Sequence, residues 1–373
     1  MKKKGLYIIL ASQDFDSANH RNLWLEMAEQ SGQEVIVANI HADYIVSRIK
    51  HKTYRIKEAK SPPVKVSEHL SVMRPLLWIR QELLPESMNW IARKGFWDSV
   101  KHAVPDVMNR HVKLLVYNAC WVSVLYGSHP DIKIGYYLFD EVRYEGRDGG
   151  LNKKRYKLDE FACRHSDVIY TMTQKLTDSR KEYNDNIITL GNGAVLPVTD
   201  KLPLIRFPRS IAFIGNFRDW IDQELLTSLI EFRRDILFAF VGTCDPNMQT
   251  YRDMLLDKYS NTIFYGKVSK DRMPLLYQQF DGVIIPYRNN EFIKATRPIK
   301  IVESIISGVP VITVPMDGYK ECEYIRFAQS MEEFSSQIDY IMSHPIDKNS
   351  ETYKNFVYDN TWSNKAKIIL STL

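Results

Sequence analysis

The chain has 373 residues, 45% of them hydrophobic and 25% charged. At about 150 residues per domain, this length predicts two or three domains that each bury a core, and the composition excludes disorder and a disulfide-stapled mini-protein. The net charge is 50 − 45 = +5, which argues against a dedicated nucleic-acid binder. The four cysteines show no paired metal or disulfide spacing, so we expect free thiols in a reducing compartment.

The N-terminus has two readings. Three lysines precede the apolar run Gly5–Ala11, as in a short secretory signal. The run is short, however, and it meets Gln13, Asp14 and Asp16 instead of a small-residue cleavage site. These residues favour a buried first strand. No stretch of the sequence approaches 18 consecutive apolar residues, so no membrane-spanning helix is predicted.

Short apolar runs rich in β-branched and aromatic residues recur along the chain, with helical stretches between them. Continuous runs are typical of parallel strands that helices cover on both faces. Two sets of such runs predict an α/β protein with two Rossmann-like, doubly wound domains that face a cleft. The predicted strands are Leu6–Leu10, Glu34–Ile40, Lys113–Ala119, Ile132–Phe139, Val168–Met172 and Ile187–Leu190, then Ile211–Ile214, Ile236–Val241, Thr262–Tyr265, Val283–Tyr287 and Val311–Val314.

The seam between the two sets is predicted near Val195–Pro208, which is rich in proline and lacks helical periodicity. We therefore expect an N-terminal domain over residues 1–200 and a second domain over 201–357. Apolar residues within Thr361–Leu373 have the spacing of a short amphipathic helix, which needs a surface to pack on. A ligand is expected at the carboxyl ends of the strands.

The segment Asp281–Pro310 is the most informative part of the chain. A strand is expected to end at Tyr287, and a helix to begin near Pro298 with Thr296 as its cap. The helix dipole, free N–H groups, Arg297 and Lys300 would then form a positive pocket for a diphosphate. Glu303, three residues after Lys300, could accept hydrogen bonds from ribose hydroxyls. The alternative is a surface helix with an ordinary Lys300–Glu303 ion pair.

The order of these residues resembles the donor-binding region of glycosyltransferases with the GT-B fold. Those enzymes show a Pro-aromatic turn, a variable loop, then Pro-x-Lys-x-x-Glu and Gly-x-Pro-Val-Ile, which matches the residues from Pro286 to Ile312 here. Four shorter segments resemble family 4 enzymes of this fold, and Thr361–Ser363 resembles the helix that crosses back onto their N-terminal domain. The four segments are Gly191–Val195, Phe213–Phe217, His165–Tyr170 and Tyr265–Val268.

The resemblance assigns roles on the donor side and a crossing helix at residues 358–373. Lys300 would neutralise the diphosphate and Glu303 would hold the ribose, while a second glutamate that family 4 places eight residues earlier is replaced by Ala295. The departure puts the usual retaining mechanism in question. The donor-binding residues expected are Gly215, Asn216, Tyr287, Thr296, Arg297, Lys300 and Glu303.

A second constellation lies in Tyr136–Glu145, where Asp140 is expected at the carboxyl end of a strand and is followed by Glu141. The segment resembles an Asp-bearing turn of xanthan-type glucuronosyltransferases, which implies that Asp140 is the catalytic base. A partly desolvated carboxylate could take the proton of an acceptor hydroxyl. The alternative is that Asp140 caps a helix beginning at Glu141. Glu141 and His20 are weaker candidates for contact with the acceptor or sugar.

No dinucleotide-binding glycine motif follows the first predicted strand, and no histidine pairs with carboxylates at metal spacing. We therefore expect neither a nicotinamide cofactor nor a metal. The only small-molecule partner expected is the donor itself, with a UDP-sugar as the first choice.

Basic and aromatic residues alternate within residues 48–100, including Trp78, Trp90, Phe96 and Trp97. Trp beside Lys and Arg suits a membrane interface and a lipid-linked acceptor. The alternative is a helical core with a charged rim.

Taken together, the sequence predicts a glycosyltransferase that moves a sugar from a nucleoside diphosphate sugar to a glycan or lipid-linked glycan. The resemblance implies a role in bacterial surface polysaccharide synthesis, in the cytoplasm at the inner face of the membrane. A nucleotide-sugar epimerase of the same fold and a non-catalytic partner subunit are the alternatives.

Overall fold

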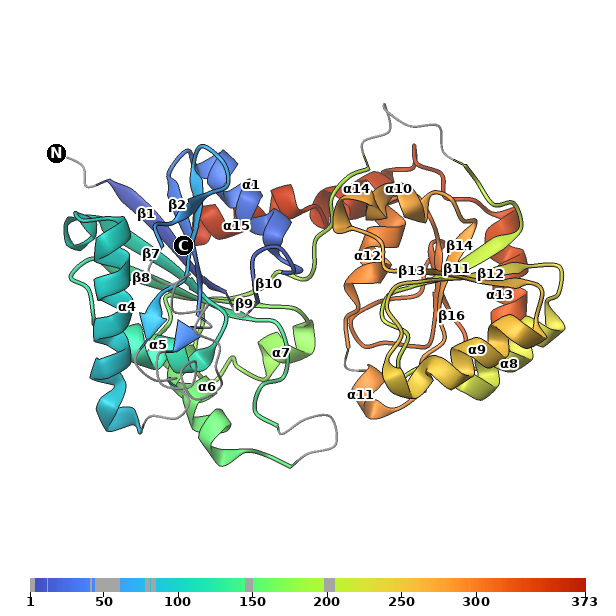
Figure 1. Ribbon diagram of the computed structural model, residues 1–373, viewed down its shortest axis with the longest axis horizontal. Coiled ribbons are helices and arrows are strands. Elements are labelled where there is room, and N and C mark those ends of the chain that lie inside the picture. Colours follow the sequence, from blue (N-terminus) through green and yellow to red (C-terminus); the bar gives the residue numbers. More distant parts are fainter. Residues whose placement is uncertain are drawn as a thin grey trace. The chain divides into compact units, whose positions relative to one another are not determined.

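The computed structural model describes residues 4–11, 13–40, 42–43, 61–77, 81, 85–144, 150–197, 205–294 and 296–373. The chain divides into two compact units, Met1–Gly191 with Trp362–Leu373 and Asn192–Thr361 (Figure 1). The boundaries therefore fall at 191/192 and 361/362, where the sequence had suggested 200/201 and 357/358. Residues after 191 join the second unit because Asn192 donates to the Arg297 carbonyl at 2.8 Å and Ala194 pairs with Thr361. Residues 198–204 of the predicted linker lie outside the described residues.

An eight-stranded sheet forms the centre of the N-terminal unit (Figure 1). Its strands run parallel except for the short edge strand β4, which pairs antiparallel with β5. The chain starts at the centre and winds outward in both directions, as in a doubly wound fold. In spatial order the strands are β10 (Ile187–Thr189), β9 (Val168–Thr171), β8 (Ile132–Leu138), β7 (His111–Val116), β1 (Gly5–Ala11), β2 (Glu34–Asn39), β5 (Leu70–Met73) and β4 (Val64–Lys65), with β3 (Ala42–Asp43) and β6 (Leu76–Leu77) paired separately.

Helices cover both faces of this sheet. Neighbouring residues of a strand point to opposite faces, so each strand packs against helices on both sides. The Tyr136 hydroxyl of β8 reaches Asp159 of α6. On the opposite face, the ring of Tyr137 lies against His20, whose ring in turn lies against Trp362 of α15. Both tyrosines are buried. The helices of this unit are α1 (Arg21–Ser31), α4 (Asn89–Ala103), α5 (Ala119–Leu125), α6 (Lys153–His165), α7 (Gln174–Asp178) and α15 (Trp362–Thr372).

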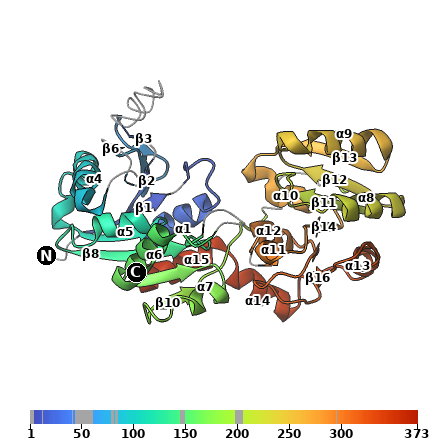
Figure 2. The same cartoon turned by 90° about the horizontal axis from the view of Figure 1, so that it is seen from below.

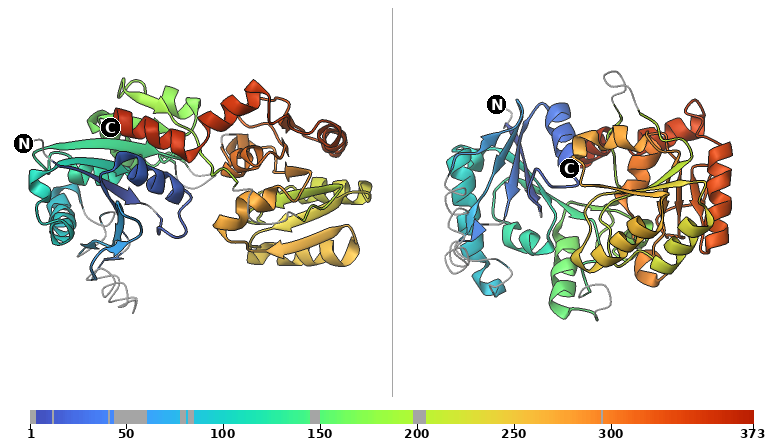
Figure 3. Two further views of the ribbon diagram at one scale, coloured as in Figure 1. Left: turned by 90° about the horizontal axis from the view of Figure 1, so that it is seen from above. Right: turned by 45° about the vertical axis from the view of Figure 1, so that its right-hand side comes forward.

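The terminal helix α15 completes the N-terminal unit. It packs beside α1, as Figures 2 and 3 also show, and buries Trp362, Ala366 and Ile369. The Gln30 amide donates to the Ser363 hydroxyl at 2.8 Å, and the Tyr170 hydroxyl lies 2.7 Å from that of Thr372. The apolar stripe of Thr361–Leu373 is therefore covered within this unit.

A six-stranded parallel sheet forms the centre of the C-terminal unit (Figure 2). Its four inner strands are continuous apolar runs that are almost fully buried, as helix cover on both faces requires, while the two edge strands are partly exposed. In spatial order they are β13 (Thr262–Gly266), β12 (Leu237–Val241), β11 (Ser210–Ile214), β14 (Gly282–Ile285), β15 (Val311–Thr313) and β16 (Ile325–Phe327). The helices are α8 (Gln223–Phe232), α9 (Gln249–Lys258), α10 (Met273–Tyr277), α11 (Glu291–Lys294), α12 (Ile299–Ile306), α13 (Met331–Ser343) and α14 (Glu351–Asp359).

The predicted α/β class with two doubly wound domains is confirmed, and all eleven predicted runs contain a strand. The strands that the sequence missed, β3 to β6 and β16, are short and lie at or near sheet edges or in the separate pair, where few apolar residues are needed. The four cysteines are free thiols. Among the described residues, none of the helices is both long and apolar enough to cross a bilayer.

Candidate active site

Two glycine turns lie side by side at the carboxyl ends of β11 and β12. Gly215 and Gly242 have φ angles of 144° and 139°, which side chains rarely tolerate. A Cβ atom on residue 242 would collide with the Gly215 carbonyl, so the two backbones touch. Gly215 donates to Val241 and Phe217 to Thr243, at 2.8 and 2.7 Å. Glycine at both positions leaves backbone where side chains would otherwise stand.

Lys300 points at this pair of turns. Its ammonium donates to the Tyr287 hydroxyl at 2.8 Å and lies 4.4 Å from the centre of the Phe213 ring. A Cβ atom on Gly215 would lie 3.0 Å from Cε of Lys300 and still closer to Nζ. Tyr287 and Phe213 are buried, so two aromatic walls fix the direction of the ammonium.

This arrangement suits an anion. Lys300 lies in the first turn of α12, where no side-chain hydrogen bond caps the helix. The helix dipole, the first amides and the ammonium therefore favour negative charge in the same region. A glycine turn next to them lets an anionic group approach the backbone closely. The structure thus brings together three of the predicted donor-binding residues: Gly215, Tyr287 and Lys300.

Glu303 lies one turn further along α12 and is half-buried. Its Oε2 atom accepts a hydrogen bond from the Tyr277 hydroxyl at 3.0 Å. Burial raises the pKa of Glu303, although the Tyr277 hydroxyl, Lys270 and Lys300 act in the opposite direction. Between the described side chains of Lys300 and Glu303 there is no ion pair, so the alternative of an ordinary surface pair is wrong.

The predicted cap of α12 is also wrong. Pro298 occupies the N-cap position, two residues after Thr296. The Thr296 hydroxyl instead donates to the Ile293 carbonyl at 2.7 Å and closes the turn after α11. The ring of Pro298 fixes its φ angle near the helical value, so the chain can begin the helix here without a side-chain oxygen as cap.

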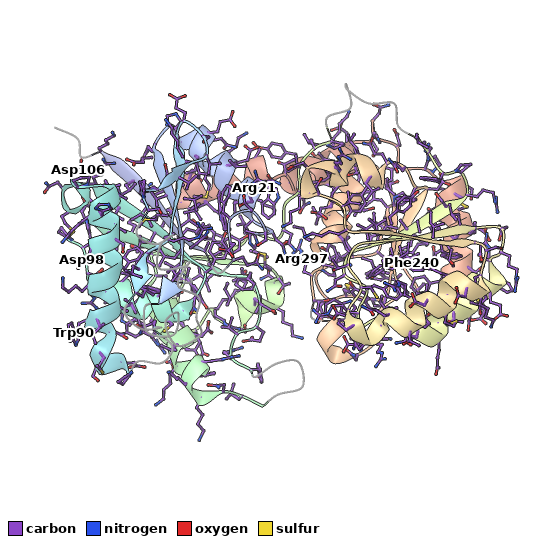
Figure 4. All side chains as sticks on the ribbon, viewed as in Figure 1. Arg21, Trp90, Asp98, Asp106, Phe240 and Arg297 are labelled. Carbon is purple, nitrogen blue, oxygen red and sulfur yellow. The ribbon has the colours of Figure 1, made fainter. Side chains whose placement is uncertain are left out.

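Arg297 and Asn216 are turned toward neighbouring loops. The guanidinium of Arg297 lies 5.2 Å from the Tyr319 ring centre, and its stem packs on Gly318. Figure 4 labels Arg297 within the C-terminal unit. The Asn216 amide donates to Asp245 at 3.0 Å and accepts from Thr243 at 2.9 Å. Asn216 therefore ties the two glycine-turn loops together, and its backbone rather than its side chain borders the Lys300 region.

Asp140 lies in an exposed turn just after β8 of the N-terminal unit. Its Oδ1 atom accepts from the Glu141 amide at 2.8 Å, and no helix begins at Glu141, so the alternative of a helix cap is wrong. Surrounding protein atoms raise the pKa of Asp140 by desolvation; the Glu141 N–H lowers it and the Glu141 charge raises it. A carboxylate at a strand's carboxyl end with a raised pKa fits a general base.

Glu141 is held by two arginines, and its predicted contact with acceptor or sugar stays a prediction. Arg180 donates to both of its carboxylate oxygens at 2.7 and 2.8 Å, and Arg143 does so at 2.9 Å. These arginines lower the pKa of Glu141 to about 2 against the effect of burial. Arg180 is fully buried and also pairs with Asp159, which accepts from Tyr136. Glu141 thus anchors the Asp140 turn to the interior.

His20 stands just before α1 and forms no side-chain cap. Its ring lies among three aromatic rings, with centroids 5.0 Å from Tyr137, 5.3 Å from Tyr117 and 5.5 Å from Trp362. The predicted contact with acceptor or sugar stays a prediction, but the observed role of the ring is packing.

The basic and aromatic stretch is only partly described. Residues 48–60 and Trp78 lie outside the described residues. On α4, Phe96 and Trp97 are buried, as the core alternative predicts, while Trp90 is 60% exposed. Figure 4 shows Trp90 on the outer side of α4. Within the part of the chain that the structure describes, no His, Cys, Asp or Glu cluster suits a metal ion.

Sequence reasoning missed the residues that hold the functional side chains. Phe213 and Tyr277 support Lys300 and Glu303, and Arg180 supports the Asp140 turn. Phe213 could have been found, because it comes two residues before Gly215 at a strand end. Tyr277 and Arg180 carried no comparable signal, since only tertiary packing brings them to their partners.

Comparison with known proteins agrees with this geometry. Residues 208–344 match the family model described as glycosyl transferases group 1. Over 102 residues the chain is 26% identical to a protein named as the teichuronic acid biosynthesis glycosyltransferase TuaH of Bacillus subtilis, covering 27% of this chain and 25% of TuaH. The alignment thus spans about a quarter of that curated relative.

Two solved structures are similar over nearly the whole chain. Sucrose-phosphate synthase from Thermosynechococcus elongatus has a TM-score of 0.70 at 12% identity, with 99% of this chain and 98% of that chain covered. HepE from Anabaena, in complex with UDP and glucose, has a TM-score of 0.61 at 12% identity, with both chains fully covered. The predicted resemblance to GT-B glycosyltransferases is confirmed, while membership of family 4 stays a prediction. The chain therefore has the GT-B fold, and its residues 208–344 match the glycosyl transferases group 1 model.

Proposed function

We propose that this protein transfers a sugar from a nucleoside diphosphate sugar, with a UDP-sugar as the first choice, to a glycan or lipid-linked glycan acceptor. The contact of Lys300 with Gly215 and Tyr287 carries the proposal. It places the ammonium group and the first amides of α12 beside a glycine turn, where no side chain keeps a diphosphate away from the backbone. The group 1 domain covers these residues, and the similar HepE structure holds UDP and glucose.

In the proposed reaction, Asp140 accepts the proton of the acceptor hydroxyl while that oxygen attacks the anomeric carbon. The bond from the anomeric carbon to the diphosphate oxygen breaks, and the nucleoside diphosphate leaves with its electron pair. Lys300 and the first amides of α12 stabilise the charge that develops on the leaving group, in the manner of an oxyanion hole. No step assigns a role to a metal.

We place the reaction in bacterial cell-surface polysaccharide synthesis, at the cytoplasmic face of the membrane. The name of TuaH, a teichuronic acid biosynthesis glycosyltransferase, supports the polysaccharide part of this setting. A thermal-shift panel of UDP, GDP, ADP and their sugars tests the donor class. A true ligand raises the melting temperature with concentration. If none of these nucleotides does so, the donor proposal is overturned.

Lys300→Met provides the decisive variant of that panel. It keeps most of the side-chain volume and removes the charge, so diphosphate binding should weaken by about 1 kcal/mol or more. Lys354→Met is the matched control, because Lys354 pairs with Glu351 on the exposed surface of the same unit. Incubation with donor alone separates transfer from epimerisation: an epimerase would isomerise the sugar without any acceptor.

A further inference from the structure

Tyr277 is a buried residue for which the proposed function has no role yet. It is the last residue of α10, and its side chain is fully buried where α10 packs against α12. Its hydroxyl donates to Oε2 of Glu303 at 3.0 Å. Phenylalanine would serve a position that needs packing alone, because burying a hydroxyl without a hydrogen-bond partner is costly. The hydroxyl of Tyr277 therefore indicates a role for its hydrogen bond.

The hydrogen bond leaves half of the carboxylate unused. An ionised carboxylate accepts about four hydrogen bonds, two at each oxygen. Within the described residues, Oε1 of Glu303 accepts none, and the residue is only half-buried, so this oxygen is open to a ligand. Tyr277 therefore fixes the rotation of the carboxylate and leaves one oxygen in a set position.

The position of that oxygen relative to Lys300 defines what it can meet. Residues three apart on a helix lie about 5–6 Å apart on the same face. Lys300 is directed to the Gly215 turn, and Glu303 lies one turn further along α12. In a nucleoside diphosphate, the distance from the phosphates to the ribose hydroxyls is similar to the distance between the positions of Lys300 and Glu303 on α12.

On the basis of the proposed function, we propose that Tyr277 is a positioning residue that orients Glu303 toward the 2′-hydroxyl of the ribose. The site thereby selects ribonucleoside diphosphates over 2′-deoxyribonucleoside diphosphates. In the free site, water donates a hydrogen bond to the partly buried carboxylate oxygen of Glu303. A bound ligand that lacks the 2′-hydroxyl displaces this water and leaves the oxygen without a donor, which weakens binding. This excludes deoxythymidine diphosphate sugars as preferred donors.

Calorimetric titration of the full chain with UDP and 2′-deoxy-UDP tests the proposal. We expect the wild type to bind UDP about tenfold more tightly, a preference equal to about 1.4 kcal/mol. Tyr277→Phe should remove most of that preference. Glu303→Met, whose side chain offers no oxygen to the hydroxyl, should remove it too, which keeps the test decisive if the first variant does not fold. A Tyr277→Phe protein that weakens both ligands equally, or that keeps the tenfold ratio, overturns the proposal.

Tyr259→Phe is the matched control. Tyr259 is also buried, and its hydroxyl donates to Glu231 at 3.3 Å, at the end of α9 that leads into β13. This variant loses a Tyr–Glu hydrogen bond remote from Lys300 and should keep the ratio between the two ligands. A wild type that binds neither nucleotide overturns the proposed function, whereas equal binding of both overturns only the present inference.

Discussion

The side chain of Lys300 occupies the space that a Cβ atom on residue 215 would need. This relationship joins the turn after β11, the first strand of the C-terminal unit, to α12, the second helix after its fourth strand. It couples the glycine to the lysine, so neither residue can change without affecting the other.

The first prediction follows from this coupling. Gly215→Ala should displace the Lys300 ammonium and also strain the backbone, whose φ of 144° suits glycine alone. We expect nucleoside diphosphate binding to weaken about tenfold and the free energy of unfolding to fall by about 1–3 kcal/mol. Titration calorimetry and thermal melting measure the two effects.

Gly127→Ala separates strain from displacement. Gly127 also has a positive φ, 63°, but a Cβ atom there would meet no atom within 4 Å. This control should lose about 1 kcal/mol of stability and bind nucleotide normally. If Gly215→Ala also binds normally, the coupling between Gly215 and Lys300 has no functional weight.

The second prediction concerns Asp140. Asp140→Asn keeps the shape of the side chain and cannot accept a proton, so transfer to an acceptor should fall by at least about a hundredfold. Nucleotide binding should stay within about twofold, because the residues placed at the diphosphate belong to the other unit. Release of nucleoside diphosphate with acceptor present measures transfer, and retained turnover would assign the base to another group.

The pH profile gives a third prediction. Transfer requires ionised Asp140, and partial desolvation raises the pKa of this group above its ordinary value of 3.8. The rate should therefore fall as the pH drops through a midpoint above 3.8, and it should be constant over the pH range above that midpoint. A profile whose acid limb lies below 3.8 would contradict the environment described for Asp140.

The fourth prediction concerns the anchor of the Asp140 turn. Arg180→Met leaves the buried Asp159 and the partly buried Glu141 without their shared partner, so we expect the N-terminal unit to lose about 3–5 kcal/mol of stability. Urea denaturation measures the loss. Arg164→Met removes an exposed pair with Glu160 on the same helix and should cost no more than about 0.5 kcal/mol. Equal midpoints for the two variants would refute the anchoring role.

Local pattern was sufficient for the strands and for the order of Gly215, Tyr287 and Lys300. Each of these features depends on a strand, a turn and a helix that are consecutive in the chain. Thr296 was misassigned because helix ends shift by one or two residues without changing the pattern, and here Pro298 takes the N-cap position itself.

Long-range partners could not be predicted in this way. Arg180 reaches Glu141 across 39 positions, and Tyr277 reaches Glu303 across 26. Nothing in the neighbourhood of either residue distinguishes a buried polar partner from ordinary core or surface. Such pairs emerge only when the packing of the helices on the sheet is known.

The placement of α15 has a consequence for biosynthesis. The sheet of the N-terminal unit is made before residues 192–361, yet α15, which buries Trp362, Ala366 and Ile369 within this unit, is made after them. During translation, residues 192–361 emerge as one continuous insertion between the two parts of the N-terminal unit. All residues of the C-terminal unit are therefore present before the N-terminal unit is complete. The N-terminal unit therefore receives the helix that completes its core only after the whole C-terminal unit has been translated.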